Sequence, residues 1–124
     1  MPSARVHHVA VFEGSAFSLL ARVVDLNNNP LVPAVVTSIT CRIFDLNAGE
    51  LIDETTLVAD EVIYGSLQSD DRWTADRIGY NVSMNQGGLS PGGHTFRIEV
   101  QFIHVDGYDI FAVWDIRCRN VFSE

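Results

Sequence analysis

Residues able to bind a metal ion or to catalyse a reaction are few in this chain. Residues 25–29 (DLNNN) and 45–49 (DLNAG) match the first half of an EF-hand calcium loop. Such a loop also needs a bidentate Glu at its twelfth position, and the residues there are Val36 and Thr56. We therefore interpret both segments as turns that are closed by their own Asp and Asn side chains.

The histidines offer no clear set of metal ligands. His7 and His8 are adjacent, so on a strand their side chains point to opposite faces and cannot hold one ion. His104, Asp106 and Asp109 surround a predicted hairpin tip where an ion could be bound, but we interpret His104 as a structural residue that closes the hairpin. The sequence therefore predicts neither a metal site nor a cofactor.

Nucleophilic catalysis needs a Ser or Cys beside a base and an orienting acid. The chain has no Gly-x-Ser-x-Gly motif, and its adjacent carboxylates diverge if they lie on strands. Cys41 and Cys118 fall on predicted inward faces, which is typical of buried free thiols, and a disulfide would require their strands to be neighbours. We predict that the protein is not an enzyme and has no catalytic residues.

Composition and charge narrow the class of protein. The 124 residues suffice for a single domain, residues 1–124, and a hydrophobic fraction of 47% excludes intrinsic disorder. The formal charge is −8 and every basic residue is an arginine, so the basic stripe of a nucleic-acid-binding protein is missing. Without an apolar run of about 18 residues or a signal peptide, we expect a cytoplasmic protein that does not bind membranes.

Residues 53–76 form the most acidic stretch, which is either a solvated face or a docking surface for a basic partner.

The clearest architectural signal is a long C-terminal hairpin over residues 94–119, where apolar and polar residues alternate as in strands with one buried face. A two-residue turn would set core residues opposite charges. A three-residue loop that ends at Gly107 instead pairs apolar residues with each other and places Arg97 opposite Asp115. The predicted apolar pairs are Phe102 with Ile110, Val100 with Ala112, Ile98 with Trp114 and Phe96 with Ile116.

Further strands follow from the same alternation. Either face of residues 6–12 can point inward, and residues 61–67 can form a strand or a single helical turn. Residues 85–93 are rich in glycine, which predicts a flexible loop. The whole chain then has seven or eight mostly antiparallel strands, the pattern of an all-β sandwich. The other predicted strands cover residues 17–23, 34–45, 51–57 and 80–85.

Two stretches resemble bacterial and phage immunoglobulin-like domains. Residues 20–36 are similar to the strand, Asp, polar turn, Pro-Leu and strand with which such domains open, and residues 91–100 are similar to their Pro-Gly entry into a late strand. Residues 76–80 partly resemble a tyrosine corner, while the cysteine pair of antibody domains is absent. The resemblance implies a single immunoglobulin-like β-sandwich. Isolated domains of this kind resemble accessory proteins of phage particles, such as capsid-decoration, neck, tail or baseplate proteins.

From the residues and this resemblance we predict a non-enzymatic structural protein that assembles through protein–protein contacts. Its partners would be copies of itself or the subunits of a larger particle, a phage virion. The protein would be made in the host cytoplasm before it joins that particle. Outward apolar residues mark contact surfaces where they are contiguous, although a second sheet could equally cover them. The predicted interface candidates are Val36, Phe44, Trp73, Phe111 and Val113.

The alternative function is binding of a carbohydrate or another ligand. Trp73 lies in a polar loop, where an exposed aromatic ring could stack on a sugar or anchor a partner protein. Tyr64 and Tyr108 are further candidate stacking platforms. In the simpler interpretation, Trp73 folds back and caps one end of the core.

Overall fold

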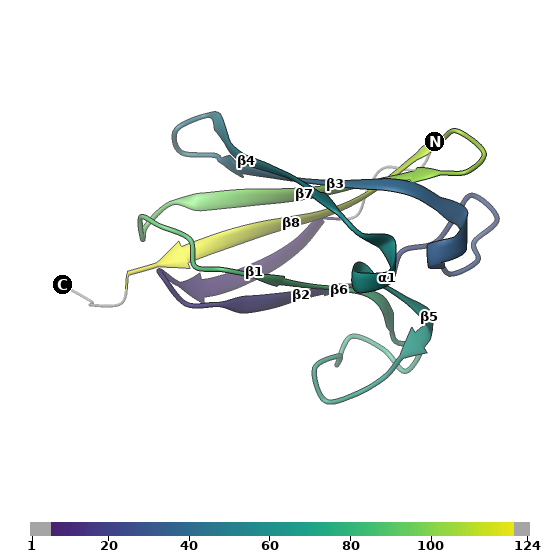
Figure 1. Ribbon diagram of the computed structural model, residues 1–124. Coiled ribbons are helices and arrows are strands. Elements are labelled where there is room, and N and C mark those ends of the chain that lie inside the picture. Colours follow the sequence, from purple (N-terminus) through teal and green to yellow (C-terminus); the bar gives the residue numbers. More distant parts are fainter. Residues whose placement is uncertain (1–5, 121–124) are drawn as a thin grey trace.

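The structure of the protein is a computed structural model that describes residues 6–120. Figure 1 shows two β-sheets that face each other, with short turns and loops between the strands. The elements in chain order are β1 (Val6–Phe12), β2 (Phe17–Ala21), the 3-10 helix η1 (Pro33–Val35), β3 (Val36–Asp45), β4 (Glu50–Leu57), α1 (Ala59–Val62), β5 (Ile63–Gln68), β6 (Tyr80–Gln86), β7 (Thr95–His104) and β8 (Asp109–Arg119).

The larger sheet has five strands in the order β1-β8-β7-β3-β4, and the smaller sheet has three in the order β2-β6-β5. Neighbouring strands are antiparallel except β1 and β8, which run parallel. The prediction of an all-β fold is confirmed. No helix within residues 6–120 has the length and apolar character needed to cross a membrane.

The predicted register of the C-terminal hairpin is confirmed. β7 and β8 pair Phe102 with Ile110 and Ile98 with Trp114, and Arg97 lies opposite Asp115. The loop closes through a hydrogen bond of 2.9 Å from the backbone N–H of His104 to the carbonyl oxygen of Tyr108. Gly107 has a φ of 91°, a backbone conformation that glycine adopts without steric cost.

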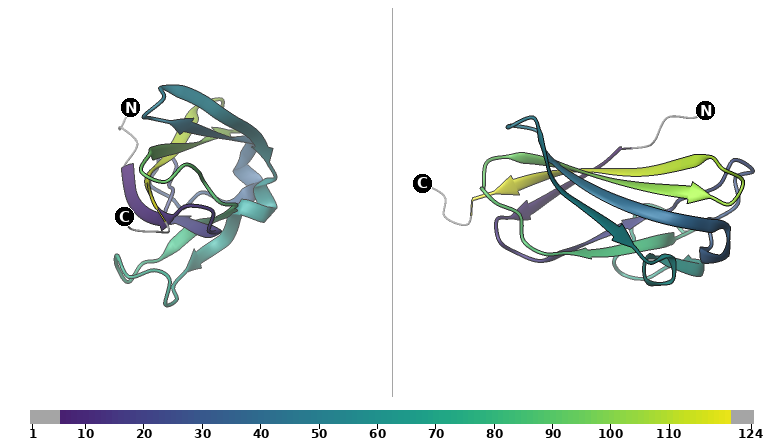
Figure 2. Two further views of the ribbon diagram at one scale, coloured as in Figure 1. Left: turned by 90° about the vertical axis from the view of Figure 1, so that its left-hand side faces the viewer. Right: turned by 45° about the horizontal axis from the view of Figure 1, so that its top comes forward.

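A single hydrophobic core fills the space between the two sheets, which Figure 2 shows from two further directions. Burying each large apolar side chain contributes roughly 1.5–3 kcal/mol. Trp114 of β8 also links the sheets, because its indole Nε1 donates a hydrogen bond of 3.3 Å to the carbonyl oxygen of Leu20 in β2. The largest buried apolar side chains are Trp114, Tyr80, Phe96, Phe102, Leu19, Leu31, Ile39, Ile98 and Ile116.

Two choices that the sequence left open are decided by packing. In β1 the inward residues are His7, Val9 and Val11, and the His7 ring stacks on Trp114 with centroids 5.9 Å apart. The segment predicted as a strand or a helical turn contains both: α1 makes one turn and β5 begins directly after it. β5 pairs with β6 only at Ile63 and Gln68, so the residues between them bulge away from the sheet.

Two interface candidates differ from the expectation, Val36 in its orientation and Val113 in its exposure. Val36 does not face outward with Phe44, because a bulge at Thr37 shifts the register of β3 against β7 and turns Val36 onto the core. Val113 is only 6% exposed, because Val6 of β1 lies directly beside it. The predicted strand over residues 34–45 accordingly starts at Val36, after the 3-10 turn.

The glycine-rich segment is tied to the rest of the protein at several points. β6 continues to Gln86, so the loop itself begins at Gly87. Leu89 is buried, and its carbonyl oxygen accepts a hydrogen bond of 2.9 Å from the backbone N–H of Gly14. The backbone N–H of Gly93 donates one of 2.7 Å to the carbonyl oxygen of Cys118. Flexibility of residues 85–93 stays a prediction, and these contacts limit the part of the loop that could move.

Asn81 of β6 is a fully buried polar residue that ties three segments together. Its Oδ1 accepts a hydrogen bond of 2.7 Å from the backbone N–H of Val23. Its Nδ2 donates bonds of 2.8 Å to the carbonyl oxygens of Val23 and Leu31. These bonds satisfy the backbone polar groups of a strand end and of the segment that follows the 25–29 turn, so the core can close over them.

We expect Asn81→Leu to lower the free energy of unfolding by about 3 kcal/mol, since it removes three hydrogen bonds to buried backbone groups. The carbonyl oxygen of Val23 keeps one bond, from the N–H of Leu31. Urea denaturation measures the change. The matched control is Asn85→Ala on the same strand, where the side chain is exposed and accepts a hydrogen bond from Ser18. A cost for Asn81→Leu as small as that of the control would contradict this role.

Candidate functional site

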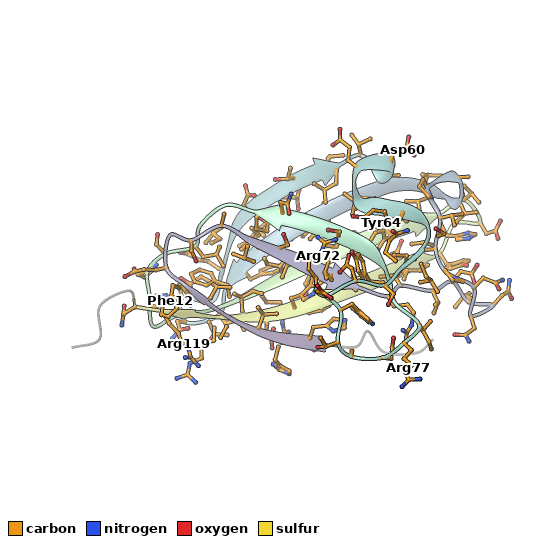
Figure 3. The ribbon with its side chains drawn as sticks, turned by 90° about the horizontal axis from the view of Figure 1, so that it is seen from below. Phe12, Asp60, Tyr64, Arg72, Arg77 and Arg119 are labelled. Carbon is orange, nitrogen blue, oxygen red and sulfur yellow. The ribbon has the colours of Figure 1, made fainter. Side chains whose placement is uncertain are left out.

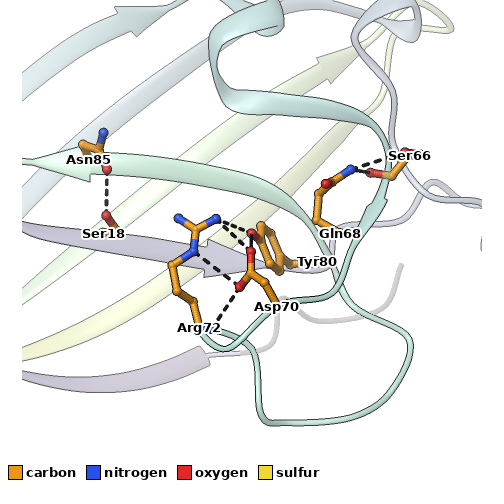
Figure 4. Close-up of polar contacts among 7 residues, drawn as sticks. All are labelled: Ser18, Ser66, Gln68, Asp70, Arg72, Tyr80 and Asn85. Atoms are coloured by element: carbon orange, nitrogen blue, oxygen red, sulfur yellow. Dashed lines mark hydrogen bonds and ion pairs between the residues drawn. The ribbon is translucent and has the colours of Figure 1, made fainter.

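The loop between β5 and β6 is held by a cluster of charged and aromatic side chains (Figure 4). The hydroxyl of Tyr80 donates a hydrogen bond of 2.5 Å to Oδ2 of Asp70. The Arg72 guanidinium donates to the same carboxylate at 3.1 Å and also to the Tyr80 hydroxyl. Hydrogen bonds from Arg72 and then from Tyr80 lower the pKa of Asp70 to about 2, so this carboxylate is ionised at neutral pH.

Asp76 organises the other end of this loop. Its Oδ1 accepts hydrogen bonds from the Trp73 indole at 2.9 Å and from the backbone N–H groups of Ile78 and Gly79. Its Oδ2 lies 2.5 Å from Nη1 of Arg22. The hydrogen bond from Trp73, followed by those from Gly79 and Arg22, holds the pKa of Asp76 well below its usual range.

Trp73 is therefore not a freely exposed platform. Its ring is half-buried, and its centroid lies 5.8 Å from that of Tyr80. This placement favours the interpretation in which Trp73 folds back onto one end of the protein. The tyrosine corner suggested by Asp76 and Tyr80 does not form, because the Tyr80 hydroxyl binds the side chains of Asp70 and Arg72 instead of the backbone.

A surface groove of about 340 Å³ lies beside this loop. It lies where β5 has not yet begun: the first residue of β5, Ile63, is opposite Val82, so residues 83–86 of β6 pair only with β2. Figure 3 shows Tyr64 and Arg72 on the face of the protein that carries the smaller sheet. The groove is lined by Leu57, Glu61, Val62, Tyr64, Arg72, Ser83, Met84, Asn85 and Gln86.

The side chains of the groove could bind a small polar ligand. The Tyr64 ring is 36% exposed, and its centroid lies 5.7 Å from that of Tyr80 in an edge-to-face arrangement. Arg72 offers hydrogen-bond donors, and the amides of Asn85 and Gln86 offer both donors and acceptors. An aromatic face beside planar polar groups is suited to a sugar. Of the three predicted platforms, only Tyr64 lines the groove.

The predicted interface residues do not form one patch. Phe111 on β8 is 39% exposed on the outer face of the larger sheet. Phe44 on β3 is half-buried on that face, between Arg97 of β7 and Leu51 of β4. The outer face between them is polar, since Gln101 of β7 lies beside Phe111. The apolar side chains are thus gathered toward the two margins of the sheet.

The segments that match an EF-hand are capped turns, as predicted. Oδ1 of Asp25 accepts backbone hydrogen bonds from Asn27 and Asn29, and Oδ1 of Asp45 accepts them from the two residues after Leu46. His104 is buried and stacks on Tyr108 at a centroid distance of 4.5 Å. No group of His, Cys, Asp or Glu side chains within residues 6–120 is placed to hold a metal ion.

Cys41 and Cys118 are buried free thiols. They lie on β3 and β8, and β7 runs between these two strands, so the condition for a disulfide is not met. Burial, together with the nearby carboxylate of Asp53, raises the pKa of Cys41 to about 11. The thiol is therefore protonated at neutral pH and is a weak nucleophile.

Comparison of the chain with protein-family models, with curated proteins and with solved structures finds no match in any of the three. The function is therefore inferred from the side chains of the protein itself.

We expect the stability supplied by Asp70 to be lost in acid. Because its pKa is about 2 in the folded protein and 3.8 ordinarily, this stability is full above about pH 4 and disappears as the pH falls toward 2. The urea midpoint of the wild type should therefore fall more steeply over this range than that of Asp70→Asn. Asp71→Asn, which removes an exposed neighbouring carboxylate, should keep the wild-type slope. Equal slopes for the wild type and Asp70→Asn would contradict the assignment.

Proposed function

We propose that the protein is a non-enzymatic structural subunit that assembles through protein–protein contacts on a larger particle, a phage virion. The observation that carries this proposal is the exposure of apolar side chains at both margins of the larger sheet. Val6 and Phe111 are 37% and 39% exposed at one margin, and Leu51 and Ile52 are 48% and 46% exposed at the other. Exposed apolar side chains are typical of contact surfaces where they are contiguous.

The order of the strands supports an immunoglobulin-like topology for this subunit. In such domains one sheet contains strands G, F, C and C′, and the other contains B, E and D. The order β8-β7-β3-β4 in the larger sheet and β2-β6-β5 in the smaller sheet corresponds to these two sets. β1 then takes the place of a first strand that pairs with strand G.

The state of the ionisable groups supports a structural role. The carboxylates of Asp70 and Asp76 are kept ionised by hydrogen bonds within their own loop, so they are not poised to accept a proton near neutral pH. Arg22 and Arg72 are engaged with these same carboxylates. This network fixes the loop and leaves these groups engaged with one another.

Sedimentation of the native protein from its source lysate through a density gradient tests the proposal. We expect the protein to migrate with a megadalton particle. Recovery only as a free small species would contradict a place in a virion.

We further expect Phe111→Asp to weaken assembly at least about tenfold, because it places a charge in the buried contact. The free energy of unfolding should change by less than about 1 kcal/mol, since Phe111 is exposed in the isolated subunit. The matched control is Ile78→Asp in the loop beside the smaller sheet, where the side chain is 57% exposed. Binding of particles by Phe111→Asp at the wild-type level would contradict this contact.

The groove supports a second candidate function, recognition of a carbohydrate, through the exposed Tyr64 ring and the neighbouring amide groups. We expect Tyr64→Ala to lower affinity on a glycan array by about tenfold, as loss of a stacking contact predicts. The control is Phe12→Ala, which removes a 56% exposed aromatic ring from β1, outside the groove. Equal glycan binding by Tyr64→Ala and the wild type would contradict carbohydrate recognition by the groove.

A further inference from the structure

We propose that the groove beside β6 binds an extended, basic segment of a partner protein, which adds as a strand to residues 83–86 of β6. The inference goes beyond the proposed assembly function, because it concerns this groove and not the exposed apolar margins of the larger sheet. Three observations carry it: the course of the groove along a strand, the unpaired backbone of that strand, and an unmatched carboxylate at each end of the groove.

The groove follows the side of β6. Four consecutive residues of this strand, Ser83 to Gln86, line it. Successive side chains of a strand point to opposite faces of the sheet. A groove that touches all four residues therefore runs along the edge of the strand, where the backbone can be reached. Its volume of about 340 Å³ lies within the range of pockets that enclose a ligand.

The backbone of β6 has no partner strand on the side of the groove. Residues 83–86 pair only with β2, and β5 begins at Ile63, opposite Val82. Alternate residues of a strand direct their N–H and C=O groups to the two sides, so part of these groups face the groove. An extended peptide presents matching groups at the same repeat of about 3.3 Å, which is how a peptide strand adds to a sheet.

Asp53 lies at the Gln86 end of the groove. It is on the core-side face of β4, because it pairs with the inward residue Ile43. The amide of Gln86 contacts the sulfur of Cys41 at 3.9 Å, and Cys41 pairs with Thr55 of β4. The hydroxyl of Thr55 in turn donates a hydrogen bond of 3.0 Å to Oδ2 of Asp53. These contacts lead from the groove to the carboxylate.

Glu61 lies at the other end of the groove. It belongs to α1, two residues before Ile63, and its exposed side chain lines the groove. Since Ile63 pairs with Val82, Glu61 lies near Ser83, the first residue of the unpaired edge. The unpaired part of β6 is thus flanked by one acid at each end.

Neither carboxylate is matched by a cation. Asp53 and Glu61 take part in no ion pair within the described part of the chain. Arg72 also lines the groove, but its guanidinium is paired with Asp70 at 3.1 Å. The formal charge of −8 makes a second copy a repelled occupant. The charges therefore favour a basic segment of a different protein.

The spacing of these groups defines the segment further. The three steps from Ser83 to Gln86 cover about 10 Å, so two long basic side chains four residues apart can reach both acids. Between the acids, Leu57 and Met84 line the groove from the core side. A residue that pairs with Met84 directs its side chain to the same face, which favours an apolar side chain there.

Calorimetric titration of the full-length protein with the acetylated and amidated peptide Arg-Thr-Val-Thr-Arg tests the inference. We expect a dissociation constant below about 1 mM, which rises as salt is raised from about 0.05 M to 0.5 M. The same peptide with glutamate in place of both arginines should bind at least about tenfold more weakly.

Two N-methylated peptides test the pairing of the backbones. One has its methyl group on the nitrogen of the central valine, and the other has methyl groups on the nitrogens of both threonines. In an added strand only one of these two sets of N–H groups faces β6. One methylated peptide should therefore lose binding at least about tenfold, while the other binds like the parent peptide. Equal binding of the two overturns strand addition.

Variants of the protein test the acids. Asp53→Asn and Glu61→Gln should each weaken binding of the basic peptide about threefold, as expected for an exposed ion pair. The matched control is Glu99→Gln on β7, which removes a charge from the outer face of the larger sheet and should bind like the wild type. Equal weakening by the control overturns the inference.

The remaining outcomes are equally decisive. Absence of peptide binding up to about 1 mM, or equal binding of the acidic peptide, overturns the inference. A protein that binds glycans through Tyr64 and no peptide would assign the groove to carbohydrate recognition instead. A protein that binds no peptide and still migrates with a particle would reject strand addition and leave the proposed assembly function standing.

Discussion

The register between β7 and β8 is the constraint on which the rest of the structure depends. The three-residue loop that ends at Gly107 sets this register, and a slip of one residue would turn every inward side chain of one strand toward solvent. With the register in place, Phe96, Ile98 and Trp114 all face the smaller sheet. β3 pairs with the free side of β7, and β1 pairs with the free side of β8, so the five-stranded sheet is built outward from this hairpin.

The width of the smaller sheet explains where the surface features lie. Three strands cannot cover five, so β4 is exposed on both faces and its apolar residues Leu51 and Ile52 remain in contact with water. β5 begins only opposite Val82, and the groove lies beside the part of β6 that β5 leaves unpaired. The exposed margin at β4 and the groove thus have a common origin in the uneven pairing of the two sheets.

The features predicted from the sequence were those with a short-range cause. Alternation along the chain and a glycine at a fixed offset were enough for the hairpin register, and the Asp and Asn side chains of residues 25–29 and 45–49 were enough for the capped turns. The faces of β1 could not be decided in this way, because both sets of residues are apolar enough. The stacking of His7 on Trp114, which is distant in the sequence, decides them.

The features that were missed depend on contacts between distant segments. Val36 turned inward because of a bulge against β7, and Val113 became buried because β1 lies beside it. The cluster around Asp70 needs Tyr80, ten residues away, to be turned toward the same carboxylate. Asn81 is a polar residue next to alternating apolar ones, and this was the one available sign of a buried amide. The same pattern is equally typical of a strand residue that is exposed.

In the proposed assembly, the two margins of the larger sheet are the contact surfaces. Hydrogen exchange measured by mass spectrometry, on the dilute free protein and on the protein in its assembled fraction, tests this claim directly. Exchange should slow on assembly in the peptides that contain β1 and β4 and stay unchanged in the loop between β5 and β6. Protection confined to that loop and the neighbouring groove, with no change at β1 and β4, would contradict the claim.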